Sequence, residues 1–257
     1  TAVTTGVQNT FVGGLAGDAT DDGIENTAVG YLALSANCGN GNAAVGHAAL
    51  LQCTGATNVA MGPSSGWSIT SGDSNTTIGQ TAGGTIATGD NNVIIGASAD
   101  VAASDTAGAN VIGRAVSGAG GYTTVGSGSD DIRAAHGNVT WATVSDERYK
   151  KDIVDSTAGL SFINALKPRT FKYKNLGELP ETFTAYKADS TDVFKNSDTN
   201  HGFIAQEVKT AIDADSGIKD GFKLWAERDD GGQELAEAAL IPMLTKAVQE
   251  LSTALDA

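Results

Sequence analysis

The feature that most constrains this chain is a short unit that recurs every 16 or 17 residues. Each unit contains Asn, two small or β-branched residues, an aliphatic residue and Gly. Full copies span Asn9–Gly13, Asn26–Gly30, Asn42–Gly46, Asn58–Gly62, Asn75–Gly79 and Asn92–Gly96. Altered copies follow at Ala109–Gly113 and Tyr122–Gly126. A fixed period of this size predicts structural repeats that stack on one another.

Each unit is typical of one coil of a parallel β-solenoid. A β-favouring run closed by Gly is followed by a second small apolar patch, such as Tyr31–Leu34, His47–Leu51 or Thr85–Thr88. Two strands of about five residues and two turns use about 16 residues. We expect Asn and Gly at the corners, where turn conformations exclude most other residues. The core positions are small, so the thin coil is predicted to share its buried face with neighbouring chains.

The composition changes near residue 144. Residues 1–144 hold 26 of the 33 glycines and no lysine, and their formal charge is 2 − 10 = −8. The remainder holds 7 glycines and has a charge of 14 − 20 = −6. We therefore predict a mainly β shaft or tip over residues 1–127, a connector over 128–144, and an α+β domain over 145–257. Within the connector, Ser127–Asp131 is predicted to be a flexible polar linker and Asn138–Val144 a strand, with Trp141 packing at a junction between chains.

Charge and cysteine content exclude several classes of protein. A net charge of −14 argues against binding to a nucleic-acid backbone. No apolar run approaches the ~20 residues of a membrane helix, so no membrane insertion is expected. Cys38 and Cys53 are interpreted as small buried hydrophobic residues of a protein assembled in a reducing cytoplasm. The acidic cluster is interpreted as a solvated turn, and we expect neither a metal nor a cofactor; its members are Asp18, Asp21, Asp22 and Glu25.

The repeat region resembles the repeats of phage fibre proteins and the heads of YadA-like trimeric adhesins. The resemblance covers roughly residues 6–127 and is carried by the Asn-to-Gly units. It implies a parallel β-roll, left-handed and assembled as a trimer. It says little about what the shaft binds, because one fold serves many functions.

Four stretches beyond residue 144 point to a second family. They are Ser145–Ile153 (SDERYKKDI), Phe162–Phe171 (FINALKPRTF), His201–Val208 (HGFIAQEV) and Leu240–Leu251 (LIPMLTKAVQEL). In this order they resemble the intramolecular chaperone auto-processing domain. That domain ends phage endosialidase tailspikes and long tail fibres, and also occurs in a eukaryotic myelin regulatory transcription factor.

The resemblance implies self-cleavage by a Ser-Lys dyad. The scissile bond would be Val144–Ser145, with Ser145 as the nucleophile and Lys150 as the general base. A lysine accepts the serine proton only when its surroundings lower its pKa towards neutrality. Residues five apart in a strand point to opposite faces, so the two side chains can meet only across a bend or between subunits. Lys151 would share the serine's face and is the alternative base.

Three further residues could support this chemistry. Gln206 or a local backbone N–H could stabilise the oxyanion. Gln206 and Glu207 could equally be structural residues at a helix start. His201 could touch the dyad or simply pack. Residues Gly177–Asn200 are polar and non-periodic, which predicts a long surface loop or small subdomain.

The C-terminal segment predicts a helix over Gln233–Leu255, with Pro242 tolerated only near its start or at a kink. The 3-4-3-4 spacing of its apolar residues is that of a coiled-coil seam formed with other chains. Burial of the helix within its own chain is the alternative. The seam residues are Ile241, Leu244, Val248, Leu251 and Leu255.

These features predict the distal part of a phage tail fibre or tailspike. Its C-terminal domain would drive homotrimerisation and then cut itself off. The expected partners are two further copies, other tail proteins and a host cell-surface receptor, either a glycan or an outer-membrane component. We expect assembly in the host cytoplasm and residence in the virion tail. The alternatives are a chaperone kept as a permanent trimeric tip, and a bacterial adhesin fragment, which would need a secretion signal and a membrane anchor. A depolymerase is disfavoured because no catalytic constellation stands out in the repeats.

Overall fold

The computed structural model describes residues 5–138, 140–143, 145–219 and 223–256. The chain forms two compact units, Thr1–Tyr149 and Lys150–Ala257. The first contains the repeats, and the second contains the helices.

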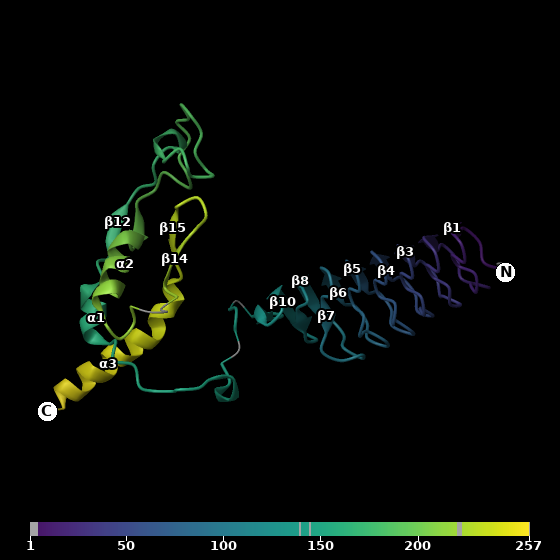
Figure 1. Ribbon diagram of the computed structural model, residues 1–257, viewed down its shortest axis with the longest axis horizontal. Coiled ribbons are helices and arrows are strands. Elements are labelled where there is room, and N and C mark those ends of the chain that lie inside the picture. The colour runs from purple at the N-terminus through teal and green to yellow at the C-terminus, as the bar shows by residue number, and fades with distance from the viewer. Residues whose placement is uncertain (1–4, 139, 144, 220–222, 257) are drawn as a thin grey trace. The chain divides into compact units, whose positions relative to one another are not determined.

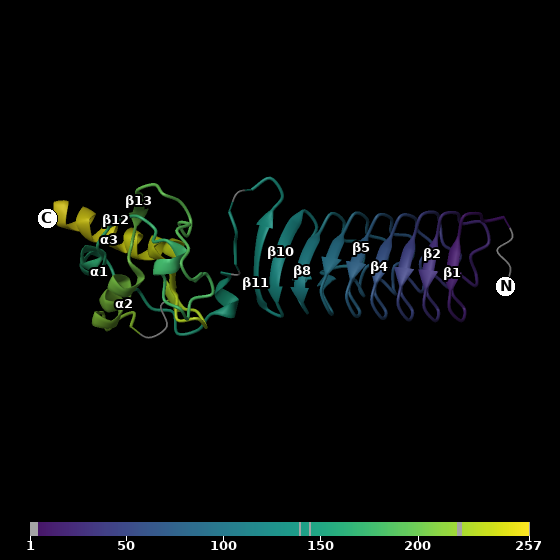
Figure 2. The same ribbon diagram turned by 90° about the horizontal axis from the view of Figure 1, so that it is seen from above.

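The repeats form the predicted parallel β-solenoid. One strand of each coil joins a nine-stranded sheet in the order β1-β2-β3-β4-β5-β6-β8-β10-β11, and Figure 2 shows these strands stacked in a row. Neighbouring strands are parallel up to β10, and β11 is antiparallel to β10. β7 and β9 form a separate parallel pair. The strands are β1 Thr10–Val12, β2 Thr27–Val29, β3 Ala43–Val45, β4 Val59–Met61, β5 Thr76–Ile78, β6 Val93–Ile95, β7 Asp100–Val101, β8 Asn110–Arg114, β9 Ser117–Gly118, β10 Tyr122–Ser127 and β11 Asp130–Ala135.

In the coils before β7 the second apolar patch is a turn, so the prediction of two strands per coil is wrong there, and among the described residues only β7 and β9 form a short second pair. In Tyr31–Leu34 the backbone is left-handed at Leu32 and Leu34, and the same holds at Ala48 and Leu50 one coil later. Alternating left-handed residues cannot lie in a pleated strand. The turns still stack, because the Leu34 N–H donates to the Ala49 carbonyl at 3.0 Å. Hydrogen bonds between coils therefore continue where strand geometry ends.

The repeated asparagines lie inside the solenoid, and this corrects their predicted role as corner residues. Asn58 is fully buried. Its Oδ1 accepts the backbone N–H of Asn75 at 2.9 Å, and its Nδ2 donates to the Gly72 carbonyl at 2.8 Å. The Oδ1 bond joins each asparagine to the next along the series from Asn9 to Asn92, and each Nδ2 in the series donates to a backbone carbonyl of the following coil. The left-handed corner position belongs instead to the residue before each asparagine, such as Thr57.

The glycine that closes each strand is required by both conformation and space. Gly46 has a φ of 135°, which L side chains rarely adopt, and a Cβ there would lie 2.6 Å from the Gly62 carbonyl oxygen. The equivalent glycine of each coil from Gly13 to Gly113 has the same conformation. This part of the corner prediction is confirmed.

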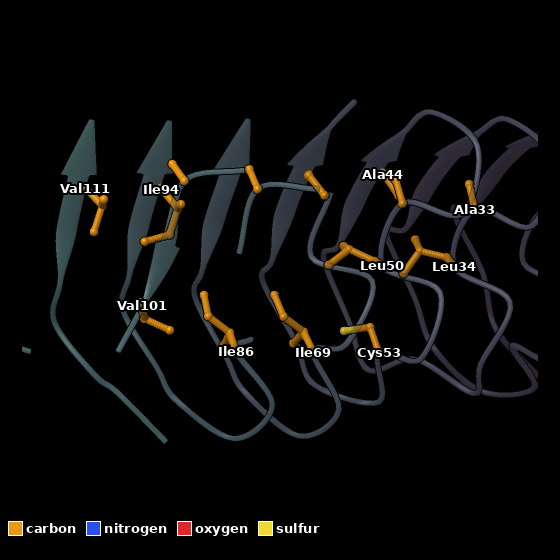
Figure 3. Close-up of a cluster of buried hydrophobic side chains, with 14 of the residues drawn as sticks. Ala33, Leu34, Ala44, Leu50, Cys53, Ile69, Ile86, Ile94, Val101 and Val111 are labelled. Carbon is orange, nitrogen blue, oxygen red and sulfur yellow. The ribbon is translucent and has the colours of Figure 1, made fainter. Parts of the chain in front are cut away.

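In two coils of the shaft core a small strand residue is followed by a large turn residue. Ala28 and Ala44 are followed by Leu34 and Leu50, and all four are fully buried. Where the strand carries the larger Thr77, the turn carries Gly83, whose Cβ would lie 2.6 Å from the threonine Cγ2. Figure 3 shows side chains from strands and turns entering the same interior row. Cys53 belongs to this core as a free thiol, and burial raises its pKa to about 12.

The stretch predicted to be a flexible linker is a β-hairpin. Ser127 ends β10 and Asp130 begins β11, and the two strands pair along their full length. The chain then returns along β11: the Arg133 N–H donates to the Ala142 carbonyl at 2.8 Å, and the Ala142 N–H donates back at 2.7 Å. The glycine of this polar stretch supplies a left-handed turn residue instead of flexibility. Val139 and Val144, which also fall in the predicted connector strand, lie outside the described residues.

The second unit packs three helices and short strand pairs around one core (Figure 1). Its centre includes Phe162, Val208, Ile212, Leu224 and Leu240. The strand pairs β12–β13 and β14–β15 are antiparallel. The elements are α1 Leu160–Ala165, β12 Arg169–Phe171, η2 Leu176–Glu178, β13 Asn200–Gly202, α2 Ala205–Ala214, β14 Trp225–Glu227, β15 Gln233–Leu235, η3 Glu237–Leu240 and α3 Ile241–Leu255.

The closing helix begins later than the sequence predicts. Gln233–Leu235 is strand β15 and Glu237–Leu240 is a 3₁₀ turn, so α3 starts at Ile241. Pro242 is the cause, because proline fits the first turn of a helix and removes a hydrogen bond farther in. The long irregular segment Gly177–Asn200 agrees with the predicted surface loop.

Candidate functional site

The predicted nucleophile lies in a short exposed segment that contains a tight bend. Ser145 is exposed, and the 3₁₀ turn η1 (Glu147–Tyr149) follows it. Asp146 fixes this turn: its Oδ1 accepts the Arg148 N–H at 2.9 Å, and its Oδ2 pairs with the Arg148 guanidinium at 2.6 Å. The hydrogen bonds from Arg148 lower the pKa of Asp146. The path from Ser145 to Lys150 is therefore not a plain strand, whose geometry would separate the two side chains.

Both candidate bases are exposed. Lys150 and Lys151 face solvent at the start of the second unit. General-base action by a lysine requires desolvation or a nearby cation. A single chain does not provide the burial that the predicted chemistry needs. Val144, the other side of the predicted scissile bond, lies outside the described residues.

The segment around Lys150 exposes large side chains. Tyr149, before the lysine, is 80% exposed, and Ile153 and Val154, after it, are 63% and 85% exposed. The chain becomes buried only at Ala158, two residues before α1. The Leu160 N–H, at the start of α1, donates to the Glu250 carboxylate of α3 at 2.8 Å.

Glu207 has a structural role. It lies in the first turn of α2, and its carboxylate forms two bonds with the Arg169 guanidinium of β12, at 2.6 and 2.9 Å. This side-chain pairing lowers the pKa of Glu207 and raises that of Arg169. The pair ties α2 to the sheet, which matches the predicted alternative of a structural residue at a helix start. Nothing in the sequence marked Arg169 as its partner.

His201 and Gln206 line one groove of about 610 Å³ within the second unit. His201 lies on β13 opposite Thr170 of β12, and Gln206 lies on the first turn of α2. The structure thus brings these two predicted residues to one surface and places Glu207 in an ion pair. The groove also has aromatic walls, which sequence reasoning missed because they come from separated segments; they include Phe171, Tyr173, Phe183, Phe194 and Phe203.

Lys195 lies over two of these aromatic rings. Its Nζ is 5.4 Å from the centroid of Tyr173 and 5.7 Å from that of Phe194. The two rings meet edge to face at 5.8 Å. These contacts pack the long loop onto β12 and shape one wall of the groove.

The predicted seam residues of α3 share an exposed face. They are between 46% and 86% exposed, and they are Ile241, Leu244, Val248, Leu251 and Leu255. The opposite face carries Met243 and Ala247, which are buried in the unit's own core. The helix therefore packs against its own chain and still presents a free apolar row.

In a comparison with known families, residues 145–216 match the family described as chaperone of endosialidase. The C-terminal part of the chain carries an endosialidase-type chaperone domain. The match begins at Ser145 and covers the first three of the four stretches that suggested it. The search of curated proteins and the search of solved structures gave no match.

The endosialidase-type chaperone domain follows a repeat region, an order that fits a tail-fibre-type chaperone role. None of the helices in the described part of the chain is long and apolar enough to cross a membrane. Within the described ranges, no cluster of three or more His, Cys, Asp or Glu side chains could hold a metal ion.

Proposed function

We propose that this chain is the distal part of a phage tail fibre or tailspike that assembles as a homotrimer and then releases its chaperone domain. The observation that carries the proposal is the family match, which starts at Ser145, just beyond the end of the β-solenoid. A chaperone domain in this position can align three shafts before it is removed. The exposed apolar row of α3 supports association of the domain with further copies of itself.

The cleavage step uses the serine that begins the chaperone domain. Neutral Lys150 accepts the Ser145 hydroxyl proton while Oγ attacks the carbonyl carbon of Val144. The C–N bond breaks, the Ser145 nitrogen leaves as an amine after receiving a proton, and an ester joins the Val144 carbonyl to Oγ. Water then hydrolyses the ester, which leaves a carboxylate on Val144 and a free serine hydroxyl.

Assembly controls this chemistry. Lys150 is exposed in the single chain, whereas a lysine acts as a general base only where it is desolvated or lies beside a cation. Packing of neighbouring subunits against Tyr149, Ile153 and Val154 would cover apolar surface and desolvate the lysine between them. Cleavage would then report that the trimer has formed.

The order of events has a physical rationale. Association of three chains in register is slow and prone to misfolding. A domain that trimerises first raises the effective concentration of the shafts. Removal of the domain leaves a fibre that is kinetically stable. The lifetime of this fibre depends on its barrier to unfolding and not on its equilibrium stability. The shaft and its turns then remain for host recognition, with a surface glycan or outer-membrane component as the receptor.

Expression followed by denaturing electrophoresis and mass spectrometry tests the cleavage. The wild type should give fragments that end at Val144 and begin at Ser145. Ser145→Ala and Lys150→Met should stay full length, and Lys151→Met, the matched control, should be cut like the wild type. Cutting of Lys150→Met but not of Lys151→Met would move the base to Lys151. An uncut, trimeric wild type would instead support a permanent chaperone tip.

Co-expression of Ser145→Ala with Lys150→Met tells whether the base comes from another subunit. If Lys150 acts on a neighbouring chain, mixed trimers restore cleavage of the Lys150→Met chain. If it acts within its own chain, both variants remain intact.

A further inference from the structure

The outward face of the solenoid sheet carries a single aliphatic column. Strands β2 to β6 each bury their middle residue, and their last residue points out of the solenoid. The strand register places these outward residues directly opposite one another across the whole sheet. In order they are Val12, Val29, Val45, Met61, Ile78, Ile95, Ile112, Val125 and Ile132.

The column is not part of the shaft's own core. Seven of its members are between 36% and 56% exposed, and Ile78 and Val125 are half-buried. The residue that precedes the strand centre widens the apolar strip in β3, β4 and β6, where it is Ala43, Val59 and Val93, and is threonine in β1, β2 and β5. A continuous apolar strip of this length is unusual on a monomer and marks an interaction surface.

Charge separates this face from the rest of the shaft. Strands β1 to β6 contain no charged residue. Of the ten acidic residues of 1–144, Asp130 and Asp131 lie in the sheet, in its last strand β11, and the others lie outside it, in turns such as those of Asp73, Asp90 and Asp105. Along β1 to β6, several acidic shafts can therefore meet on the sheet face without bringing carboxylates together.

The spacing of the column favours one kind of binding partner. One aliphatic side chain recurs at each strand, and neighbouring strands of a sheet are about 4.8 Å apart. A surface with the same rise at every level can match all nine side chains, whereas a helix or an irregular partner would lose register after one or two levels. A second copy of this chain, running parallel, has that rise by construction.

We propose that the copies of the shaft meet on this sheet face, in parallel and in register, with the aliphatic column of each copy at a common three-fold axis. This inference rests on the proposed homotrimer and names its shaft interface, which lies outside the residues matched to the chaperone family. Residues of equal number face one another across the axis. The interface holds the fibre together after the chaperone domain has left.

Cysteine cross-linking of the full chain tests the proposal. Val45→Cys and Ile95→Cys are made separately in a Ser145→Ala background, so that the chain stays in one piece. Ser71→Cys, on an exposed turn away from the sheet, is the matched control. The parent chain, whose native Cys38 and Cys53 are buried, serves as the blank. Each sample is treated with a short bismaleimide, and its molar mass is measured by light scattering before treatment.

A trimer should cross-link at Val45→Cys and at Ile95→Cys about tenfold faster than at Ser71→Cys, because equal residues are held close across the axis. Co-expression of the two sheet variants, one carrying a size tag, should give no mixed product. β3 and β6 are three strand spacings apart, or about 14 Å, so cysteines at these levels do not meet.

A trimer that cross-links at Ser71→Cys as fast as at the sheet positions would overturn the proposed interface and leave the homotrimer standing. Mixed products between Val45→Cys and Ile95→Cys chains would overturn the register. A monomeric parent chain would overturn the homotrimer and the interface together.

Discussion

At the scale of single residues, buried asparagines set the spacing of the shaft. Each side chain does in one coil what a backbone peptide group does in a sheet: it accepts an N–H and donates to a carbonyl one coil away. Buried polar groups are costly unless their hydrogen bonds are complete. This series of hydrogen-bonded asparagines, the asparagine ladder, favours one register between neighbouring coils. A slip of one residue would leave an asparagine and its neighbours without hydrogen-bond partners.

We predict that Asn58→Ala destabilises the shaft by about 3 kcal/mol, because the Asn75 N–H and the Gly72 carbonyl lose their partners inside the solenoid. Denaturant unfolding monitored by circular dichroism measures this change. Asn40→Ala is the control: Asn40 accepts the Ile24 N–H at 3.0 Å but is exposed, so water replaces it and the cost is below about 1 kcal/mol. Equal losses for both variants would contradict the ladder.

Asp230 shows how one carboxylate fastens the long loop of the second unit. It accepts the Gly232 N–H at 2.9 Å, and the Thr184 N–H and hydroxyl at 3.1 Å. These bonds lower the pKa of Asp230 from 3.8 to about 2, with the Gly232 N–H contributing most. A carboxyl group with a depressed folded-state pKa stabilises the fold above its unfolded pKa, and that contribution is lost as the pH falls through about 2.

We expect the Thr184 amide resonance to titrate with a midpoint near pH 2. Asp230→Asn should remove the titration, and the loop should then be cut faster by proteases at neutral pH. A midpoint near 4, the ordinary range of an aspartate, would show that Asp230 does not hold the loop.

At the scale of elements, α3 has one face buried in its own unit and one exposed apolar face. Met243 and Ala247 pack against its own unit, and Glu250 accepts the N–H of Leu160 at the start of α1. The seam of Ile241 to Leu255 remains exposed. The helix is thus partly buried in its own chain, and the seam with other chains stays a prediction for its exposed face, because a 15-residue helix has room for both faces.

We predict that Val248→Asp leaves the fold of the single unit intact. The subunit concentration needed for trimer formation should rise at least tenfold, since three carboxylates would meet in the seam. Gln249→Asp, one residue along and off the seam, should assemble as the wild type does. Light scattering over a dilution series measures the effect. Loss of helical signal in Val248→Asp would mean that the side chain also serves the unit's own fold.

At the scale of the whole molecule, the two units differ in how their contacts are arranged along the chain. The shaft joins residues 16 or 17 apart, coil after coil. The second unit joins distant segments, such as Leu160 and Glu250 at a separation of 90 residues. Folding of such a shaft can propagate from coil to coil once it has begun. Contacts between neighbouring coils of one chain do not make three shafts begin to fold together. The chaperone domain is suited to supply that start.

We expect residues 1–144 expressed alone to give monomers or aggregates, whereas the whole chain gives trimers. Ser145→Ala, which keeps the domain attached, should assemble as well as the wild type and so separates folding from cleavage. Native electrophoresis and light scattering of the three proteins check this. Trimers formed by the isolated shaft would show that the domain is dispensable for assembly.

The sequence by itself determined the period, the parallel solenoid, the required glycines, the restriction of Pro242 to a helix start or kink, and the family of the second unit. These follow from local chemistry that recurs or that few residues can satisfy: Gly46 alone fits its φ of 135°, and Pro242 fits only a first helical turn.

Only the tertiary structure decided which way the side chains face. It placed Asn58 inside the solenoid, gave the second patch of the early coils a turn in place of a strand, paired Glu207 with Arg169 and left Lys150 exposed. The physical reason is that burial and pairing depend on groups one coil or many residues away. The alternation of residue types along the chain does not contain that information.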